Sequence, residues 1–331
     1  MKDGFERKTE YLRISLTDRC NLRCQYCMPS QGVTFRRHED MMKYEEMLRL
    51  VEILAGAGVK KVRLTGGEPT VRRDLTWFVK ELSGIRGIEQ IGLTTNGLKF
   101  AEMADELYDA GLRLVNISLD TLNEEVYKYI TGQYGAKKVM DAVNIALMTG
   151  YKVKVNCVPL KEINERYLPE VAYIARDRAV DVRFIELMPI GCGKAFEGVP
   201  TEDVKTILKN TLGIYREETE FLQEIGEEPE FAGPAKYVRF KDFEGRCGFI
   251  SPMSDCFCDR CNRLRLTADG CIKPCLYSDE KINICSMMRA GASDKDILAA
   301  IHEVLSHKNQ RHSFGRDILG QEHRRMNEIG G

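Results

Sequence analysis

Short apolar runs alternate with segments of helical periodicity over the first 190 residues. Six of these runs read as strands, and the segments between them repeat apolar positions every three or four residues, several ending at a glycine. The repeat is roughly 30 residues, the length of one βαβ unit, which predicts a parallel sheet in doubly wound or barrel form. The expected strands are 11–16, 61–66, 88–95, 113–120, 151–159 and 181–189, and the expected helices are 44–57, 74–82, 101–110, 137–149 and 168–178.

Polar side chains gather where these runs end, as at Thr94, Ser118, Asp120 and Glu186. Barrels carry their chemistry at the carboxyl ends of the strands, so this distribution favours a barrel. We therefore expect an α/β fold: an incomplete (β/α)6 TIM-like barrel in residues 1–190, with a C-terminal extension in residues 191–331 that covers the barrel mouth.

The pattern changes after residue 190. A turn-rich stretch leads into a short helix, an acidic stretch, a strand, a hairpin turn and a last helix. The short helix is expected at 202–209, the acidic stretch at 217–230, the strand at 237–240, the hairpin turn at 268–270 and the last helix at 294–306.

Composition excludes several classes of protein. Of the 331 residues, 43% are hydrophobic and 30% are charged, which allows a sizeable core and excludes a disordered chain. The net charge of -1 offers no overall excess for holding a nucleic-acid backbone. The sequence has no long apolar run, and its opening MKDGFERKTE is polar. We expect a cytoplasmic protein with no membrane segment and no nucleic-acid partner.

Cysteine is abundant and clustered. One group is Cys20, Cys24 and Cys27, and a second lies between Cys256 and Cys275. In a reducing compartment, close cysteine groups indicate metal binding or redox work rather than disulfides. Two thiolate-bound metal sites are the first hypothesis.

The first group has the spacing CxxxCxxC and follows the first strand. Three thiolates bind three irons of a 4Fe-4S cluster and leave the fourth iron open to another ligand. A structural zinc site is the competing interpretation, but it needs four ligands and no fourth lies nearby in the sequence.

This motif, with Tyr26 before its last cysteine, resembles the radical S-adenosylmethionine (radical SAM) enzymes. The resemblance extends to TGGEP at 65–69, after the second strand. It implies that the open iron chelates S-adenosylmethionine, with Gly67, and possibly Glu68, at the methionyl amine. It also implies one-electron cleavage of this cofactor to a 5'-deoxyadenosyl radical that abstracts a hydrogen atom.

The second group contains Cys258, Cys261 and Cys275 in the pattern CxxC-x13-C. From spacing alone a zinc ribbon stays open, because Cys256 or Cys271 could supply a fourth ligand. In the adjacent run RLRL (263–266) the two arginines share one face of a strand, which suits phosphate or a purine edge.

Together these motifs, and the ending IGG, resemble the GTP 3',8-cyclase (MoaA) family of molybdenum cofactor biosynthesis over essentially the whole chain. The resemblance implies two 4Fe-4S clusters, with Cys20, Cys24 and Cys27 on the first and Cys258, Cys261 and Cys275 on the second, whose open iron contacts guanine. The implied S-adenosylmethionine contacts are Tyr26, Gly67, Ser118 and Met188. The implied GTP contacts are Arg13, Arg63, Thr94, Lys154, Arg263, Leu264 and Arg265, with Arg263 and Arg265 also in a catalytic role and Arg183 as a weaker candidate.

The resemblance implies hydrogen abstraction from C3' of GTP and attack on C8, giving 3',8-cyclo-7,8-dihydro-GTP. The implied partners are a downstream MoaC-type cyclic pyranopterin monophosphate synthase, an electron donor such as flavodoxin or ferredoxin, and a second copy in a possible homodimer. The terminal Gly330-Gly331 is expected to enter the active site. Two alternatives remain open: a radical SAM peptide maturase with an auxiliary cluster, and a non-catalytic zinc-binding protein.

Overall fold

The computed structural model describes residues 1–29, 31–217, 233–312 and 325–330. Six parallel strands from the first 185 residues form the middle of one twisted sheet, in the order β1-β2-β3-β4-β5-β6. All six expected strands are confirmed. Their bounds are β1 Tyr11–Ser15, β2 Lys61–Thr65, β3 Gln90–Thr95, β4 Leu114–Ser118, β5 Lys152–Cys157 and β6 Asp181–Ile185.

The second half of the chain adds strands to both edges of this sheet. β10 (Arg263–Leu266) pairs in parallel with β1, and β9 (Arg246–Ile250) pairs in parallel with β6. Beyond them the sheet continues in antiparallel strands, so the full order is β12-β11-β10-β1-β2-β3-β4-β5-β6-β9-β8-β7. The outer strands are β7 Tyr215–Glu217, β8 Lys236–Phe240, β11 Cys271–Lys273 and β12 Ile282–Asn283.

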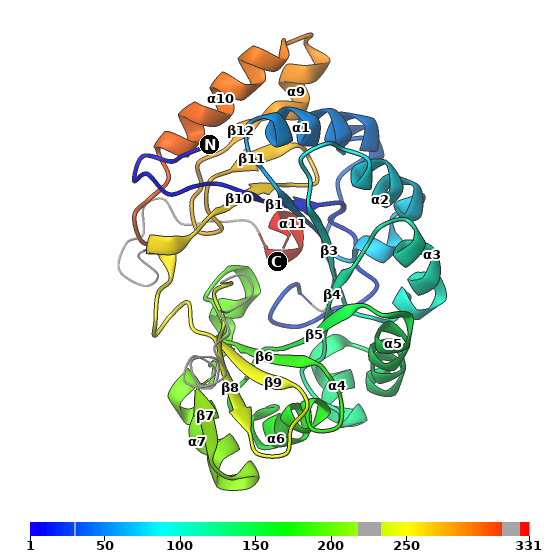
Figure 1. Ribbon diagram of the computed structural model, residues 1–331, viewed down its shortest axis with the longest axis vertical. Coiled ribbons are helices and arrows are strands. Elements are labelled where there is room, and N and C mark those ends of the chain that lie inside the picture. Colours follow the sequence, from blue (N-terminus) through cyan, green and yellow to red (C-terminus); the bar gives the residue numbers. More distant parts are fainter. Residues whose placement is uncertain (30, 218–232, 313–324, 331) are drawn as a thin grey trace.

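The strands form an open arc with most helices on its outer side (Figure 1). The expected incomplete TIM-like barrel is therefore confirmed. A division of the chain at residue 190 stays a prediction, because the ladder between β6 and β9 joins the two parts in one sheet. The outer helices are α1 Tyr44–Gly56, α2 Leu75–Ser83, α3 Ala104–Asp109, α4 Glu124–Thr131, α5 Ala136–Thr149 and α6 Leu168–Ala172.

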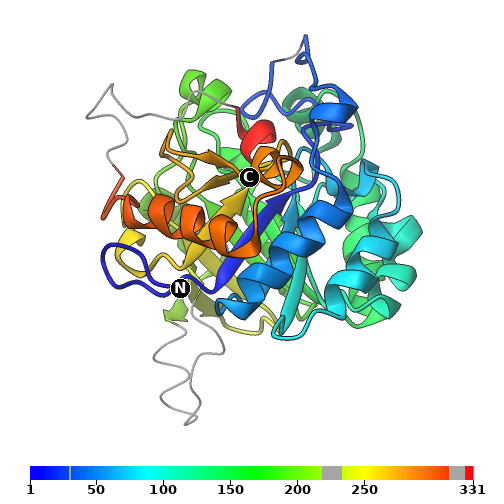
Figure 2. The ribbon, with the colours of Figure 1, turned by 90° about the horizontal axis from the view of Figure 1, so that it is seen from above.

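Two of the later helices occupy different places. α10 (Asp294–Ser306) lies beside α1, as Figure 2 shows. α11 (Met326–Ile329) lies on the concave side of the arc (Figure 1). The remaining helices are α7 Thr201–Leu212 and α9 Ile284–Arg289, and the 3-10 helices are η1 His38–Asp40, η2 Pro69–Val71, η3 Phe100–Met103, η4 Glu165–Tyr167, η5 Tyr173–Ala175, η6 Gly191–Ala195 and η7 Cys258–Arg260.

The two faces of the sheet differ in polarity. Side chains alternate along a strand, and on β1 and β2 the apolar set, which includes Leu12 and Leu64, is fully buried. It belongs to the same core as the apolar faces of α1 and α2, which include Leu54 and Phe78. Burial of this kind is worth roughly 25 cal/mol per Å² of apolar surface, so the outer face stabilises the fold. The inner face is left for polar residues.

Two expected helices are shorter than their periodicity suggested. The helix expected at 168–178 breaks into α6 and η5, because the carbonyls of Ala175 and Arg176 accept hydrogen bonds from Gly245 and Glu244. The segment 101–110 is a 3-10 turn followed by α3. Neither α4 nor α9 was expected. Most of the acidic stretch lies outside the described residues.

Candidate active site on the concave face of the barrel

A row of arginines crosses the concave face. In the ladder, Arg13 on β1 is paired with Arg265 on β10 and with Arg63 on β2, so the three lie side by side on neighbouring strands. On β3 the row continues at Gly92, where a Cβ atom would lie 2.9 Å from the guanidinium carbon of Arg63. Gly92 therefore leaves the space that the Arg63 guanidinium occupies.

This row has a strongly positive environment. Burial, and then the charge of Arg265, lower the pKa of Arg13 well below its usual value. Burial and Arg263 lower the pKa of Arg265 to about 10. Burial alone would raise the pKa of Tyr11, but Arg63 and Arg13 outweigh it and bring the value to about 8. Arg63 also donates to the Tyr11 hydroxyl at 2.5 Å. These cations are arranged to receive an anion.

Lys154 on β5 reaches the same face but is paired within the protein. Its Nζ lies 2.9 Å from Asp181 Oδ2 and donates to the Tyr237 hydroxyl at 3.1 Å. Arg246 binds the same carboxylate with two nitrogens, at 2.8 and 2.9 Å. Although burial opposes it, hydrogen bonding from Arg246 and the charge of Lys154 hold the pKa of Asp181 below its usual value.

The other substrate candidates differ in what their side chains offer. The buried hydroxyl of Thr94 has no hydrogen-bond partner among the described residues, so it is available to a ligand. Arg183 donates to Asn156 Oδ1 at 3.0 and 2.6 Å. The side chain of Leu264 is fully buried, and it belongs to the hydrophobic core of the barrel, so only its main chain could reach a substrate.

The first cysteine group lies on the loop after β1. Asn96, at the end of β3, binds Asn21 Oδ1 at 2.8 Å and lies 3.9 Å from Cys20 Sγ, which also accepts from the Leu22 amide at 3.3 Å. Burial raises the pKa of the Cys20 thiol to about 11 and that of Cys27 to about 12. A metal group that stabilises the thiolates is therefore needed for these thiols to ionise near neutral pH.

The thiols of the first cysteine group do not form a compact set of ligand atoms. Within the described ranges, the only three Cys, His, Asp or Glu ligand atoms that lie within 4.8 Å of one another belong to Cys256, Cys258 and His312. At least one pair of the Cys20, Cys24 and Cys27 thiols therefore lies more than 4.8 Å apart.

The TGGEP loop packs directly against the cysteine loop. The Gly67 amide donates to the Thr17 carbonyl at 2.6 Å, and a Cβ on Gly67 would lie 2.3 Å from the Arg19 carbonyl oxygen. Glu68 is fully enclosed, and its carboxylate accepts from Thr95 Oγ1 at 2.7 Å and from the Asn96 amide at 2.7 Å. Glu68 thus joins this loop to the end of β3, and its carboxylate is occupied within the protein.

The remaining cofactor candidates gather near the same rim. The Tyr26 hydroxyl donates to Asp120 Oδ2 at 2.8 Å, and Ser118 ends β4 two residues earlier. Burial raises the pKa of Asp120 to about 6. A Cβ on Gly193 in η6 would lie 2.7 Å from the Met188 carbonyl and 3.6 Å from the Tyr26 carbonyl. That glycine lets the Met188 segment approach the first cysteine loop.

The second cysteine group lies at η7 and the strands after it. Lys308 is buried and donates to the carbonyls of Cys261 and Arg263 at 3.0 and 2.9 Å. Burial would raise the pKa of the Cys261 thiol, but the charges of Lys308 and Arg263 outweigh it and hold the value below the ordinary one. Cys275 and Cys261 are close enough to Arg265 for their charges to interact with it.

The two extra cysteines of this segment differ. The Cys271 thiol is buried and donates to Asp269 Oδ2 at 3.7 Å, within the turn that joins β10 and β11. Cys256 lies beside Cys258. Sequence reasoning left both open as metal ligands, and only Cys256 is placed among other ligand atoms.

The C-terminal segment enters the concave face. The Gly330 carbonyl accepts from Arg265 Nη1 at 2.8 Å, and Figure 1 shows this end of the chain inside the arc. A Cβ on Gly330 would lie 2.6 Å from Thr65 Oγ1 and 2.9 Å from the Ser15 Cβ, so a side chain has no room. The expectation for Gly331 falls outside the described residues.

Sequence reasoning missed Tyr11, Asp181, Tyr237 and Lys308. The first two alternate with apolar residues on predicted strands, a signal that could have placed them inside the barrel. The other two gave no signal, because their partners are distant in the chain.

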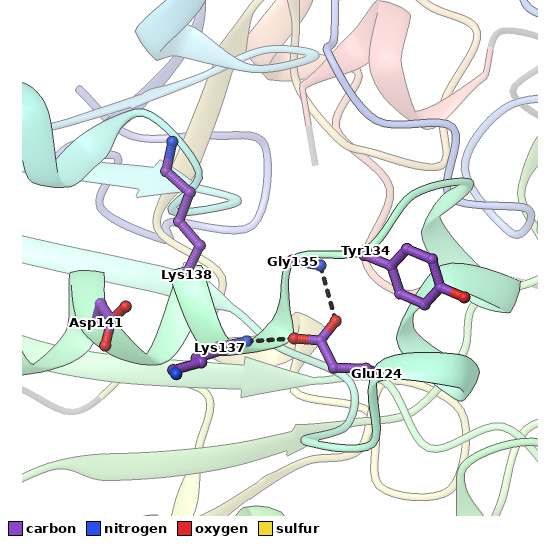
Figure 3. Close-up of a pocket in the computed structure, with 6 residues that line it drawn as sticks. All are labelled: Glu124, Tyr134, Gly135, Lys137, Lys138 and Asp141. Carbon is purple, nitrogen blue, oxygen red and sulfur yellow. Dashed lines mark hydrogen bonds between the residues drawn. The ribbon is translucent and has the colours of Figure 1, made fainter.

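The hollow between α4 and α5 lies outside this site (Figure 3). There the Glu124 carboxylate accepts from the amides of Gly135 and Lys137, at 2.9 Å each. Those bonds hold the pKa of Glu124 below its usual value, so its role is to anchor the start of α5. Among the described residues, no helix has the length and apolar character needed to cross a membrane.

Similarity to known proteins covers the whole chain. The radical SAM superfamily model matches residues 14–172, and the Molybdenum Cofactor Synthesis C model matches residues 180–314. The chain is 42% identical to a GTP 3',8-cyclase of Clostridium perfringens and 43% identical to one of Moorella thermoacetica, over 100% of both chains in each case. It is 40% identical to molybdenum cofactor biosynthesis protein 1 of Mus musculus, over 100% of this chain and 51% of that protein.

Solved structures share the fold at low identity. The Streptococcus suis protein SuiB bound to precursor peptide SuiA matches with a TM-score of 0.62 at 16% identity, over 90% of this chain and 65% of that one. Native anSMEcpe with bound AdoMet matches with a TM-score of 0.58 at 18% identity, over 92% and 82%. Full-length identity and both family models agree: the chain belongs to the GTP 3',8-cyclase family of radical SAM enzymes, a membership that implies a 4Fe-4S cluster and S-adenosylmethionine.

Proposed function

We propose that this chain converts GTP to 3',8-cyclo-7,8-dihydro-GTP in molybdenum cofactor biosynthesis. The observation that carries the proposal is the row formed by Arg265, Arg13 and Arg63. Neighbouring strands are about 4.8 Å apart, so these like charges repel. Arg265 is buried, and Arg13 and Arg63 are partly buried. A triphosphate is an anion with enough charge to offset both costs. The name shared by the full-length relatives supports the same substrate.

The proposed substrate contacts follow from the charge or hydrogen-bonding group that each side chain can offer to GTP. Arg13 and Arg63 bind the phosphates, and Lys154 joins them by sharing its charge between Asp181 and the substrate. The hydroxyl of Thr94 supplies a hydrogen bond to the nucleoside. Leu264 contributes through its main chain.

The two bound groups are held by different sets of residues. Cys20, Cys24 and Cys27 hold the first 4Fe-4S cluster. Bound there with S-adenosylmethionine, it supplies the one-electron chemistry that removes the C3' hydrogen atom of GTP. The residues that orient S-adenosylmethionine are Tyr26, Gly67, Ser118 and Met188.

Cys258, Cys261 and Cys275 would hold a second 4Fe-4S cluster, which would serve to bind the base of GTP. Arg263 and Arg265 act beside it as catalytic residues. Burial and Arg263 lower the pKa of Arg265 to about 10, which leaves it protonated at neutral pH and able to donate hydrogen bonds to the substrate. Its bond to the Gly330 carbonyl fixes the guanidinium on the concave face.

We also propose the protein's partners, compartment and assembly from its membership in the family. The product passes to a MoaC-type cyclic pyranopterin monophosphate synthase, and electrons come from a flavodoxin or ferredoxin. The protein works in the cytoplasm, and a homodimer is the proposed assembly. A peptide substrate is not favoured, since the SuiB and anSMEcpe likeness is at 16% and 18% identity and shows the fold alone.

Anaerobic product analysis tests the proposal. The full chain, reconstituted with iron and sulfide, is incubated with GTP, S-adenosylmethionine and a reductant. We expect 5'-deoxyadenosine and the cyclised nucleotide, and about eight irons per chain if both clusters form. The variant Arg63→Leu should lose GTP binding in calorimetry, whereas Lys60→Leu, which removes an exposed pair with Glu89, should not. Deoxyadenosine without nucleotide product would contradict the assignment.

A further inference from the structure

Two different sets of metal-ligating side chains share Cys258. The wide set is Cys258, Cys261 and Cys275, which the proposed function uses. The tight set is Cys256, Cys258 and His312, whose ligand atoms all lie within 4.8 Å of one another. The proposed cluster leaves Cys256 and His312 without a role.

The tight set has the dimensions of a single-ion site. Two thiolates about 2.3 Å from a zinc ion in tetrahedral geometry are about 3.8 Å apart. The three ligand atoms therefore need to approach one another by at most about 1 Å, which side-chain rotation can supply. Sulfur and imidazole ligands select zinc and related divalent transition metals over calcium or magnesium.

One ring nitrogen of His312 is hydrogen-bonded to the backbone, as is common for metal-binding histidines. His312 Nε2 lies 2.7 Å from the Pro252 carbonyl oxygen, which can only accept, so this nitrogen carries the proton. The lone pair is then on Nδ1. A histidine ligand commonly donates its second ring N–H to a carbonyl in this way, which fixes the tautomer and the ring. Tyr277 packs against the ring, with centroids 6.3 Å apart.

We propose that Cys256, Cys258 and His312 bind one divalent ion of the zinc class when the second cluster is absent. Three protein ligands leave the fourth tetrahedral position to water, as in catalytic zinc sites. Because Cys258 belongs to both sets, the ion and the second cluster exclude each other. This exclusion rests on the proposed function, while ion binding itself does not. Zinc would then regulate the enzyme by delaying assembly of its second cluster.

Cobalt(II) binding tests the ion site directly. The full chain with Cys20, Cys24 and Cys27 replaced by serine removes the other thiol group. Titration of this chain, without cluster, should give one Co2+ with sulfur-to-metal absorption and a tetrahedral d–d band, displaced by one Zn2+. Cys256→Ser and His312→Gln should each weaken binding at least tenfold. The matched controls Cys271→Ser and His307→Gln should not, since Cys271 pairs with Asp269 and His307 with Glu280. Equal binding by all four variants would overturn the proposal.

Competition during reconstitution tests the exclusion. Wild-type protein loaded with iron and sulfide beside one equivalent of Zn2+ should keep the first cluster and lose the second, with iron falling by about half. Cys256→Ser should keep both clusters under the same conditions. Full iron in the wild type with zinc present would refute the exclusion. Only one cluster in the wild type without zinc would instead refute the second cluster of the proposed function, and the cobalt result would stand separately.

Discussion

Replacing the buried Lys308 by methionine should loosen the second cysteine segment while leaving the first intact. The Lys308 ammonium donates to the Cys261 and Arg263 carbonyls at 3.0 and 2.9 Å, and it lies 3.9 Å from Asp3 Oδ2. Methionine keeps the volume but provides no donor. These carbonyls are partly buried, so the loss of each donor costs up to about 1–3 kcal/mol. Asp3 keeps a charged partner in this variant, because Arg7 Nε still donates to its carboxylate at 2.6 Å.

We therefore expect a loss of about 3–5 kcal/mol in the free energy of unfolding, the range also found when one partner of a buried pair is removed. Urea unfolding of the cluster-free chain, followed by circular dichroism, measures it. Lys60→Met removes an exposed pair with Glu89 and should change stability by no more than about 0.5 kcal/mol. After reconstitution the Lys308→Met variant should retain the first cluster and bind less iron at the second. A loss below about 1 kcal/mol with full iron content would refute the reasoning.

Other predictions follow from single contacts of the site. Arg265→Ala should keep both clusters but lose turnover; normal product formation would show that this arginine face is only structural. Gly330→Ala should lower activity with iron content unchanged, because its Cβ would lie 2.6 Å from Thr65 Oγ1; normal activity would count against insertion of the tail. Gly92→Ala should weaken GTP binding in calorimetry by crowding the Arg63 guanidinium, whereas Gly56→Ala, which has open space around its Cβ, should not. For Asp120, the folded pKa of about 6 exceeds the usual 3.8, so folding favours the protonated acid, and the cost of ionisation grows as pH rises from about 4 to above 6. Asp120→Asn should therefore gain stability over the wild type across that interval, by at most about 3 kcal/mol in urea unfolding, and a pH-independent difference would exclude this cause.

Much of the fold and of the candidate site could be predicted from the sequence, because the patterns that indicate them involve residues close together in the chain. The alternation in segments such as Tyr11–Ser15 and Lys61–Thr65 places apolar residues on one face and arginines on the other, and a parallel sheet then follows from strand spacing. The cysteine spacings indicate two metal sites for the same reason, since the cysteines of each group lie close together in the sequence. The resemblance to the family was visible in these motifs, and full-length identity and the family models then established membership.

Pairings between distant segments were decided only in three dimensions. Nothing in the sequence shows that Arg265 lies beside Arg13, because β10 inserts next to β1 across some 250 residues of chain. Lys308 and His312 belong to no sequence motif. Each contacts the second cysteine segment only in the folded protein. Periodicity and spacing report on neighbours in sequence, whereas charge clusters and ligand sets depend on which strands become neighbours in the folded sheet.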